Sequence, residues 1–124
     1  MDDKKKRSPL YKSFGYAFEG IDRTIKEERN IKIHFAAAVL VILLGIWLQI
    51  SEMEWLICFL LFALIISLEL VNTAVEAVVD LVTKEKKPLA KKAKDAAAGA
   101  VLFSAIIAAI IGCRIFLPKI VLLF

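Results

Sequence analysis

Three long apolar runs are the feature that most limits how this chain can fold. They occupy residues 35–50, 55–68 and 96–113. The first and third approach the length of about 20 residues with which a helix crosses a bilayer. The second is too short to cross about 30 Å of hydrocarbon at about 1.5 Å per residue, so its helix must continue through Glu69. We therefore predict an all-α integral membrane protein with three transmembrane helices.

Charged residues are kept apart from these runs. The chain has 17 Lys and Arg against 13 Asp and Glu, and most of them lie in residues 1–32 and 84–95. Basic segments next to transmembrane helices favour the cytoplasmic side. The turn 51–54 has two glutamates and no basic residue, so it should face outward. We predict a multi-pass membrane protein whose basic segments face the cytoplasm.

These patterns define one domain with six segments. No cleavable signal peptide is expected, because about thirty charged or amphipathic residues precede the first apolar run. Three short helices cannot enclose a polar site alone, so we expect a homo-oligomer. The predicted segments are a cytoplasmic arm 1–32, transmembrane helices 33–50, 55–82 and 96–116, a cytoplasmic loop 83–95 and an outer tail 117–124.

The cytoplasmic arm carries an amphipathic pattern. Apolar residues recur at helical spacing, which predicts a helix lying in the membrane surface. If that helix continues, Glu28 falls on its apolar stripe, either because the helix frays there or because the carboxylate has a function. The apolar positions are Leu10, Phe14, Ala17, Phe18, Ile21 and Ile25.

The second transmembrane helix carries a polar stripe in the segment SLELVNTAVEAVVD, residues 67–80. Its four polar side chains, Glu69, Asn72, Glu76 and Asp80, fall within about 80° of one another around the helix. Measured from Trp55, Glu69 lies about 21 Å along the helix and Glu76 about 31 Å, so Glu69 is inside the hydrocarbon and Glu76 is at the cytoplasmic interface. Intramembrane ionisable groups indicate a functional site. The alternative is hydrogen bonding between helices, worth about 0.6–2 kcal/mol.

This gradation suits phosphoryl transfer from a soluble nucleotide to the hydroxyl group of a lipid. Glu69 could act as a general base on the hydroxyl, and Glu76 could bind Mg²⁺, which prefers one or two carboxylates together with phosphate oxygens. Lysines in residues 84–94 would neutralise the polyphosphate. The five glycines form neither a Walker A motif nor a kinase glycine-rich loop. A conventional nucleotide-binding fold is therefore excluded.

Three segments together resemble the prokaryotic diacylglycerol kinase family of small membrane lipid kinases. They are ELVNTAVEAVVD (69–80), AKDAAAGAVL (93–102), and GYAFEG (15–20) followed by Glu28. The resemblance implies a homotrimer whose subunits share active sites, each with an amphipathic surface helix and three transmembrane helices. It also implies ATP as phosphoryl donor, Mg²⁺ as cofactor and a lipid alcohol as acceptor.

The resemblance also assigns roles to individual residues by position. Glu69 would be the catalytic base, and Glu28 and Glu76 would bind Mg²⁺, with Glu28 reaching the metal across a subunit boundary. Lys94 would face phosphate. The full set expected to bind the nucleotide and its metal is Tyr16, Glu28, Asn72, Glu76, Glu85, Lys86, Lys87, Lys94 and Asp95.

Two branches of that family differ in their acceptor. The segments ERNIKIH (28–34) and KKPLAKKAKDAAAGAV (86–101) resemble the Gram-positive branch, whose members look like undecaprenol kinases. The Gram-negative branch favours diacylglycerol and carries a carboxylate at the position of His34, which leaves the role of His34 open. Diacylglycerol kinase is the alternative within this class. From a different class, a small transporter could use Glu69 as its intramembrane carboxylate.

Overall fold

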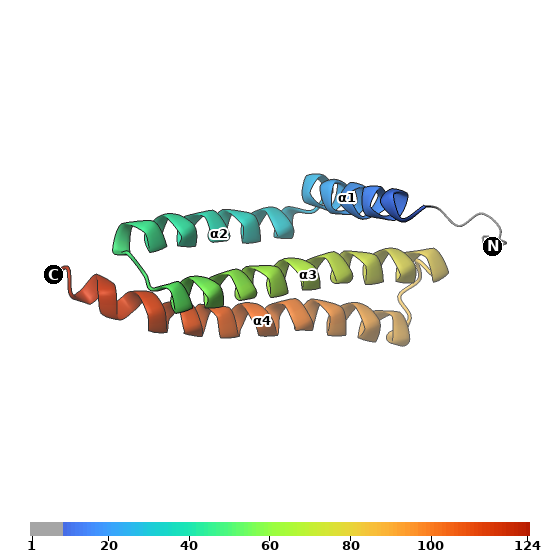
Figure 1. Ribbon diagram of the computed structural model, residues 1–124. Coiled ribbons are helices and arrows are strands. Elements are labelled where there is room, and N and C mark those ends of the chain that lie inside the picture. Colours follow the sequence, from blue (N-terminus) through green and yellow to red (C-terminus); the bar gives the residue numbers. More distant parts are fainter. Residues whose placement is uncertain (1–8) are drawn as a thin grey trace.

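The computed structural model describes residues 9–124, which form four helices (Figure 1). These are α1 (Leu10–Glu27), α2 (Arg29–Leu48), α3 (Glu52–Val82) and α4 (Pro88–Val121). The three longer helices lie side by side, and the short α1 lies at the end where α3 connects to α4. The predicted all-α class, with a short N-terminal helix and three long ones, is confirmed.

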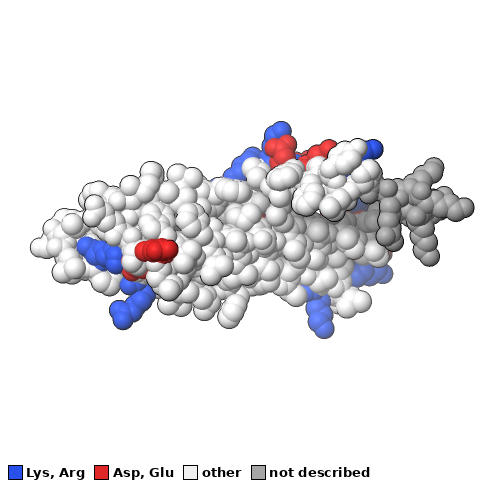
Figure 2. Space-filling model, in the orientation of Figure 1, with Lys and Arg blue, Asp and Glu red and all other residues white. Residues whose placement is uncertain are grey.

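All three long helices are long and apolar enough to cross a membrane. Many of their large apolar side chains point away from the bundle; Leu40, Leu60 and Ile110 are 59%, 71% and 60% exposed. Figure 2 shows charged side chains gathered toward the two ends of one face, with a broad uncharged surface between them. Such an apolar surface is typical of helices that lie in a bilayer.

The turn between α2 and α3 is tight and well capped. Gln49 adopts a left-handed conformation with φ of 53°, and its N–H caps the end of α2. Ser51 begins α3 with a capping box: its Oγ accepts from the backbone N–H of Glu54, and its own N–H donates to Glu54 Oε1. Gly45 lets Trp55 approach closely, since an added Cβ would lie 2.7 Å from its ring. The two helix ends that this turn connects are thereby fixed relative to each other.

The helices extend beyond the segments expected from charge alone. Because α4 begins at Pro88, the expected cytoplasmic loop 83–95 consists of a short connection, 83–87, and the first two turns of α4. The lysines and alanines of residues 90–98 are strong helix formers, so charge does not interrupt the helix. The same helix continues to Val121, which places most of the expected outer tail in its last turns.

The junction between α1 and α2 corrects one expectation about Glu28. Helix α1 ends at Glu27, and Glu28 is extended, with φ of −100° and ψ of 123°. The direction of its side chain is therefore not set by the apolar stripe of α1. That stripe is itself present: Leu10, Phe14 and Phe18 are exposed, and no residue of α1 is buried. An apolar stripe without a protein partner is typical of a helix lying in the membrane surface.

Candidate functional site

Burial along the polar stripe of α3 decreases steadily toward the end where α3 meets α4. Glu69 and Asn72 are buried, with 3% and 7% exposure, while Glu76 is half-buried and Asp80 is exposed. The helical spacing inferred from the sequence therefore brings these four side chains onto one face, from the bundle interior to its end. Burying a carboxylate is costly unless polar groups surround it, so the neighbours of Glu69 matter most.

Two side chains approach the carboxylate of Glu69. His34 Nε2, on α2, lies 3.5 Å from Glu69 Oε2, and Asn72 Nδ2 donates to Glu69 Oε1 over 3.5 Å. These three residues line a small cavity of about 220 Å³ together with Asn30 and residues of α4. Asn72 Oδ1 is buried there without a hydrogen-bond partner among the described residues. The cavity is thus lined by the carboxylate-bearing Glu69, an acceptor for a hydroxyl group that enters it.

A second group of charges surrounds Glu76, seven residues further along α3. The carboxylates of Glu28 and Asp80 and the ammonium group of Lys94 all act electrostatically on Glu76. Lys94 Nζ lies 2.7 Å from Asp80 Oδ1, joining α4 to α3. Glu28 lies at the α1–α2 junction of the same chain, and its charge is one of those that act on Glu76.

The remaining candidates lie around this end of the bundle without joining the cluster. Asp95 pairs with Lys91 on its own helix instead of with Lys94. Lys87 Nζ lies 3.4 Å from Glu85 Oε2 within the α3–α4 connection, where Lys86 is also exposed. Tyr16, on α1, is 58% exposed. These side chains are exposed, on α1, on the α3–α4 connection and on the first turns of α4.

The donor set fits a divalent cation that arrives with phosphate. Among residues 9–124, no three His, Cys, Asp or Glu side chains are grouped closely enough to hold a metal ion by themselves. Glu28 and Glu76 supply two carboxylates of like charge, which a cation between them would stabilise. Mg²⁺ commonly binds one or two carboxylates and completes its coordination with water and phosphate oxygens. Glu28 and Glu76 are therefore suited to Mg²⁺ bound to a nucleotide.

Three residues of the site escaped the sequence analysis. His34 had no assigned role, and Asp80 was recognised as part of the stripe but not as the partner of Lys94. Asn30 lines the cavity at Glu69 and had not been considered. Their positions depend on how α2 and α4 pack against α3, which no local pattern specifies. The place of Asp80 on the stripe follows from the spacing of Glu69 and Glu76, whereas its pairing with Lys94 does not.

Comparisons with known proteins place these residues in a family. The sequence profile of the prokaryotic diacylglycerol kinases matches residues 15–116. Undecaprenol kinase of Bacillus subtilis is 52% identical over 96% of this chain and 99% of its own length. Diacylglycerol kinase of Synechocystis is 43% identical over 88% of this chain and 63% of its own length, and that of Escherichia coli is 29% identical over 84% and 85%. The chain belongs to the prokaryotic diacylglycerol kinase family.

Proposed function

We propose that this protein transfers the terminal phosphate of ATP to the hydroxyl group of undecaprenol, at the cytoplasmic face of the bacterial cytoplasmic membrane. The relatives of this chain are named undecaprenol kinase and diacylglycerol kinase, and both names describe a lipid kinase activity. The observation that carries the proposal is the buried carboxylate of Glu69. This carboxylate accepts a hydrogen bond from Asn72, and Glu76 with its charged neighbours follows seven residues further along α3.

In the proposed reaction, Glu69 accepts the proton of the lipid hydroxyl group. The hydroxyl oxygen then forms a bond to the terminal phosphorus of ATP, while the bond from that phosphorus to the bridging oxygen breaks and ADP leaves. Asn72 orients Glu69 through its amide group. Glu76 lies about 10 Å nearer the end of the helix than Glu69, which leaves room for the transferred phosphate between them.

Glu28 and Glu76 would hold Mg²⁺, which when bound neutralises charge on the phosphate oxygens. Lys94 is available to phosphate because its pair with Asp80 is partly exposed and therefore weak. The remaining nucleotide contacts would come from Asp95 and from exposed residues of α1 and the α3–α4 connection. We assign these contacts to Tyr16, Glu85, Lys86 and Lys87.

The similarity to the undecaprenol kinase of Bacillus subtilis over almost its whole length favours undecaprenol as acceptor. We expect the purified protein in micelles to phosphorylate undecaprenol with a higher kcat/KM than diacylglycerol, measured as phosphate transfer from ATP. The reverse preference would establish the diacylglycerol alternative. Transfer to neither lipid by folded protein would refute the proposed function and revive a role for Glu69 in transport.

We also propose a homotrimer, which the family resemblance implies and which would cover part of the exposed apolar surface of the three long helices. Which chain supplies Glu28 to a given Glu76 would then depend on the packing of α1 between neighbours. Within one chain the two carboxylates already interact.

The proposed orientation predicts a labelling pattern in intact cells. With Cys58 and Cys113 replaced by Ala, a Glu52→Cys chain should react with a membrane-impermeant maleimide, because this residue is exposed at the outer turn. A Lys84→Cys chain should react only after the cells are permeabilised. Labelling of position 84 in intact cells would place the candidate site outside, away from cytoplasmic ATP.

A further inference from the structure

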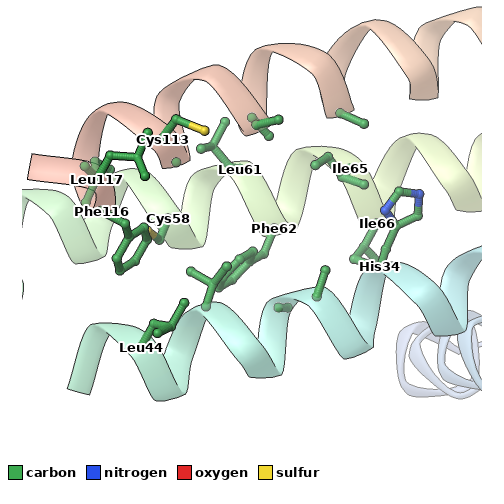
Figure 3. A pocket seen from close by; sticks show the side chains of 18 residues that line it. His34, Leu44, Cys58, Leu61, Phe62, Ile65, Ile66, Cys113, Phe116 and Leu117 are labelled. Atoms are coloured by element: carbon green, nitrogen blue, oxygen red, sulfur yellow. The ribbon is translucent and has the colours of Figure 1, made fainter. Parts of the chain in front are cut away.

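His34 lies next to the proposed base, yet the proposed reaction gives it no role. Figure 3 shows its ring directed from α2 toward α3. Its Nε2 atom is 3.5 Å from Glu69 Oε2. A small rotation of either side chain would bring the two atoms within hydrogen-bonding distance, about 2.7–3.2 Å.

The proposed reaction leaves a proton on Glu69 at every turnover. The next lipid hydroxyl group can be deprotonated only after that proton has left. The side chain of Glu69 is 4% exposed, so water has little direct access to its carboxylate. A second group that takes up the proton and also reaches water would return Glu69 to its basic form.

The neighbours of Glu69 offer one suitable acceptor. The amide of Asn72, which donates to Glu69 Oε1, is not a base. Glu76 lies about 10 Å further along α3. Among the described residues that line the cavity at Glu69, Asn30 is a second amide and the α4 residues are apolar. This leaves His34, and an imidazole can both take up and release a proton near neutral pH.

His34 also connects Glu69 with the end of the bundle. Its side chain is 22% exposed, and Asn30, which lines the same cavity one helical turn earlier, is exposed as well. On another side the ring borders a cavity of about 470 Å³, whose other described side chains are hydrocarbons or cysteine thiols. Water needs two to four polar partners, so it can approach the ring past Asn30 but not through these apolar walls.

We propose that His34 is a proton relay, which receives from Glu69 the proton of the lipid hydroxyl group and passes it to water on the Asn30 side. The inference rests on the proposed function and adds the step that resets the site. The O–H bond at Glu69 Oε2 breaks as an N–H bond forms at His34 Nε2, in a ring whose own proton is on Nδ1. The imidazolium then loses one proton to water, which leaves a neutral ring and a carboxylate.

Comparing the first turnover with later ones separates a relay from a structural role. In His34→Gln, Glu69 begins without a proton, so the first turnover should keep the wild-type rate in a rapid-quench measurement. Later turnovers should slow by about tenfold or more, so one phosphate per site forms in a burst. Ile33→Gln is the matched control, because Ile33 is 56% exposed and lines neither cavity. Both of its rates should equal those of the wild type.

Two outcomes of this measurement would overturn the proposal. If His34→Gln slows the first and the later turnovers equally, His34 shapes the site and does not reset it. If neither phase is slowed, the proton leaves by another route, such as the phosphate product.

Chemical rescue gives a second readout. His34→Ala leaves room for an imidazole molecule from solution, which should raise the steady-state rate. Pyrazole has nearly the same shape but is a much weaker base, so it should not. Glu69→Gln, which keeps His34, should respond to neither compound. Acceleration of His34→Ala by both compounds equally, or by neither, would overturn the relay.

These results separate the relay from the proposed function. A folded wild type that phosphorylates no lipid alcohol refutes the function. A wild type that phosphorylates undecaprenol, with no burst in His34→Gln, leaves the function standing and refutes the relay.

Discussion

Glu69→Gln should lower kcat by about 10²–10⁴-fold, measured at saturating ATP and lipid alcohol. The amide has nearly the size of the carboxylate and can still accept from Asn72 Nδ2, so the helix bundle should keep its structure. What is lost is the ability to take the hydroxyl proton. The circular dichroism spectrum and the oligomer size should match those of the wild type.

A neighbouring polar residue provides the control. Thr73 Oγ1 donates only to the backbone of its own helix, at Glu69 O, so Thr73→Val removes a hydroxyl group beside the site without touching the carboxylate. Its kcat should stay close to that of the wild type. A Glu69→Gln protein that keeps more than about a tenth of the wild-type rate would show that another group accepts the proton.

Glu76→Gln should raise the Mg²⁺ concentration needed for half-maximal activity by about 10–100-fold or more. The amide cannot supply the negative charge that the cation requires, and Glu28 would remain as the only nearby carboxylate of the expected pair. Glu28→Gln should shift the same curve in the same direction. The measurement is the rate at fixed total ATP as Mg²⁺ is increased.

Glu52→Gln serves as the control, because Glu52 is exposed at the opposite end of α3. Its Mg²⁺ dependence should equal that of the wild type. Unchanged Mg²⁺ curves for both Glu76→Gln and Glu28→Gln would place the metal on other residues, with Asp80 and Asp95 the nearest carboxylates to examine.

Features that follow from spacing along one helix could be predicted from the sequence. The polar face of α3 is one, because 3.6 residues per turn brings Glu69, Asn72 and Glu76 into line whatever surrounds them. The three long helices are another, since length and hydrophobicity alone identify them. The segments that carry the resemblance to the kinases also needed no structure, and the family comparison confirms them.

Features that depend on packing between helices could not be predicted. The contact of His34 with Glu69 joins residues far apart in the sequence, and nothing in either segment specifies it. Glu28 is a single extended residue between two helical segments. Because the sequence on both sides of it favours helix, the apolar periodicity gave no sign of the break. The ion pair of Lys94 with Asp80 joins α4 to α3 and likewise depends on how these two helices pack.

The two ion pairs that join α3 to α4 lie near opposite ends of the bundle. Lys119 Nζ is 3.0 Å from Glu54 Oε2 near the α2–α3 turn, and Lys94 pairs with Asp80 near the α3–α4 connection. Glu54 and Asp80 are separated by about 39 Å along α3. That length is close to the thickness of a bilayer with its headgroups, about 40–45 Å, so each pair can lie in a headgroup layer.

A thicker or thinner membrane would change the tilt of the bundle and move Glu69 relative to the phosphate layer. The thickness of the host membrane is therefore part of what sets the depth of Glu69.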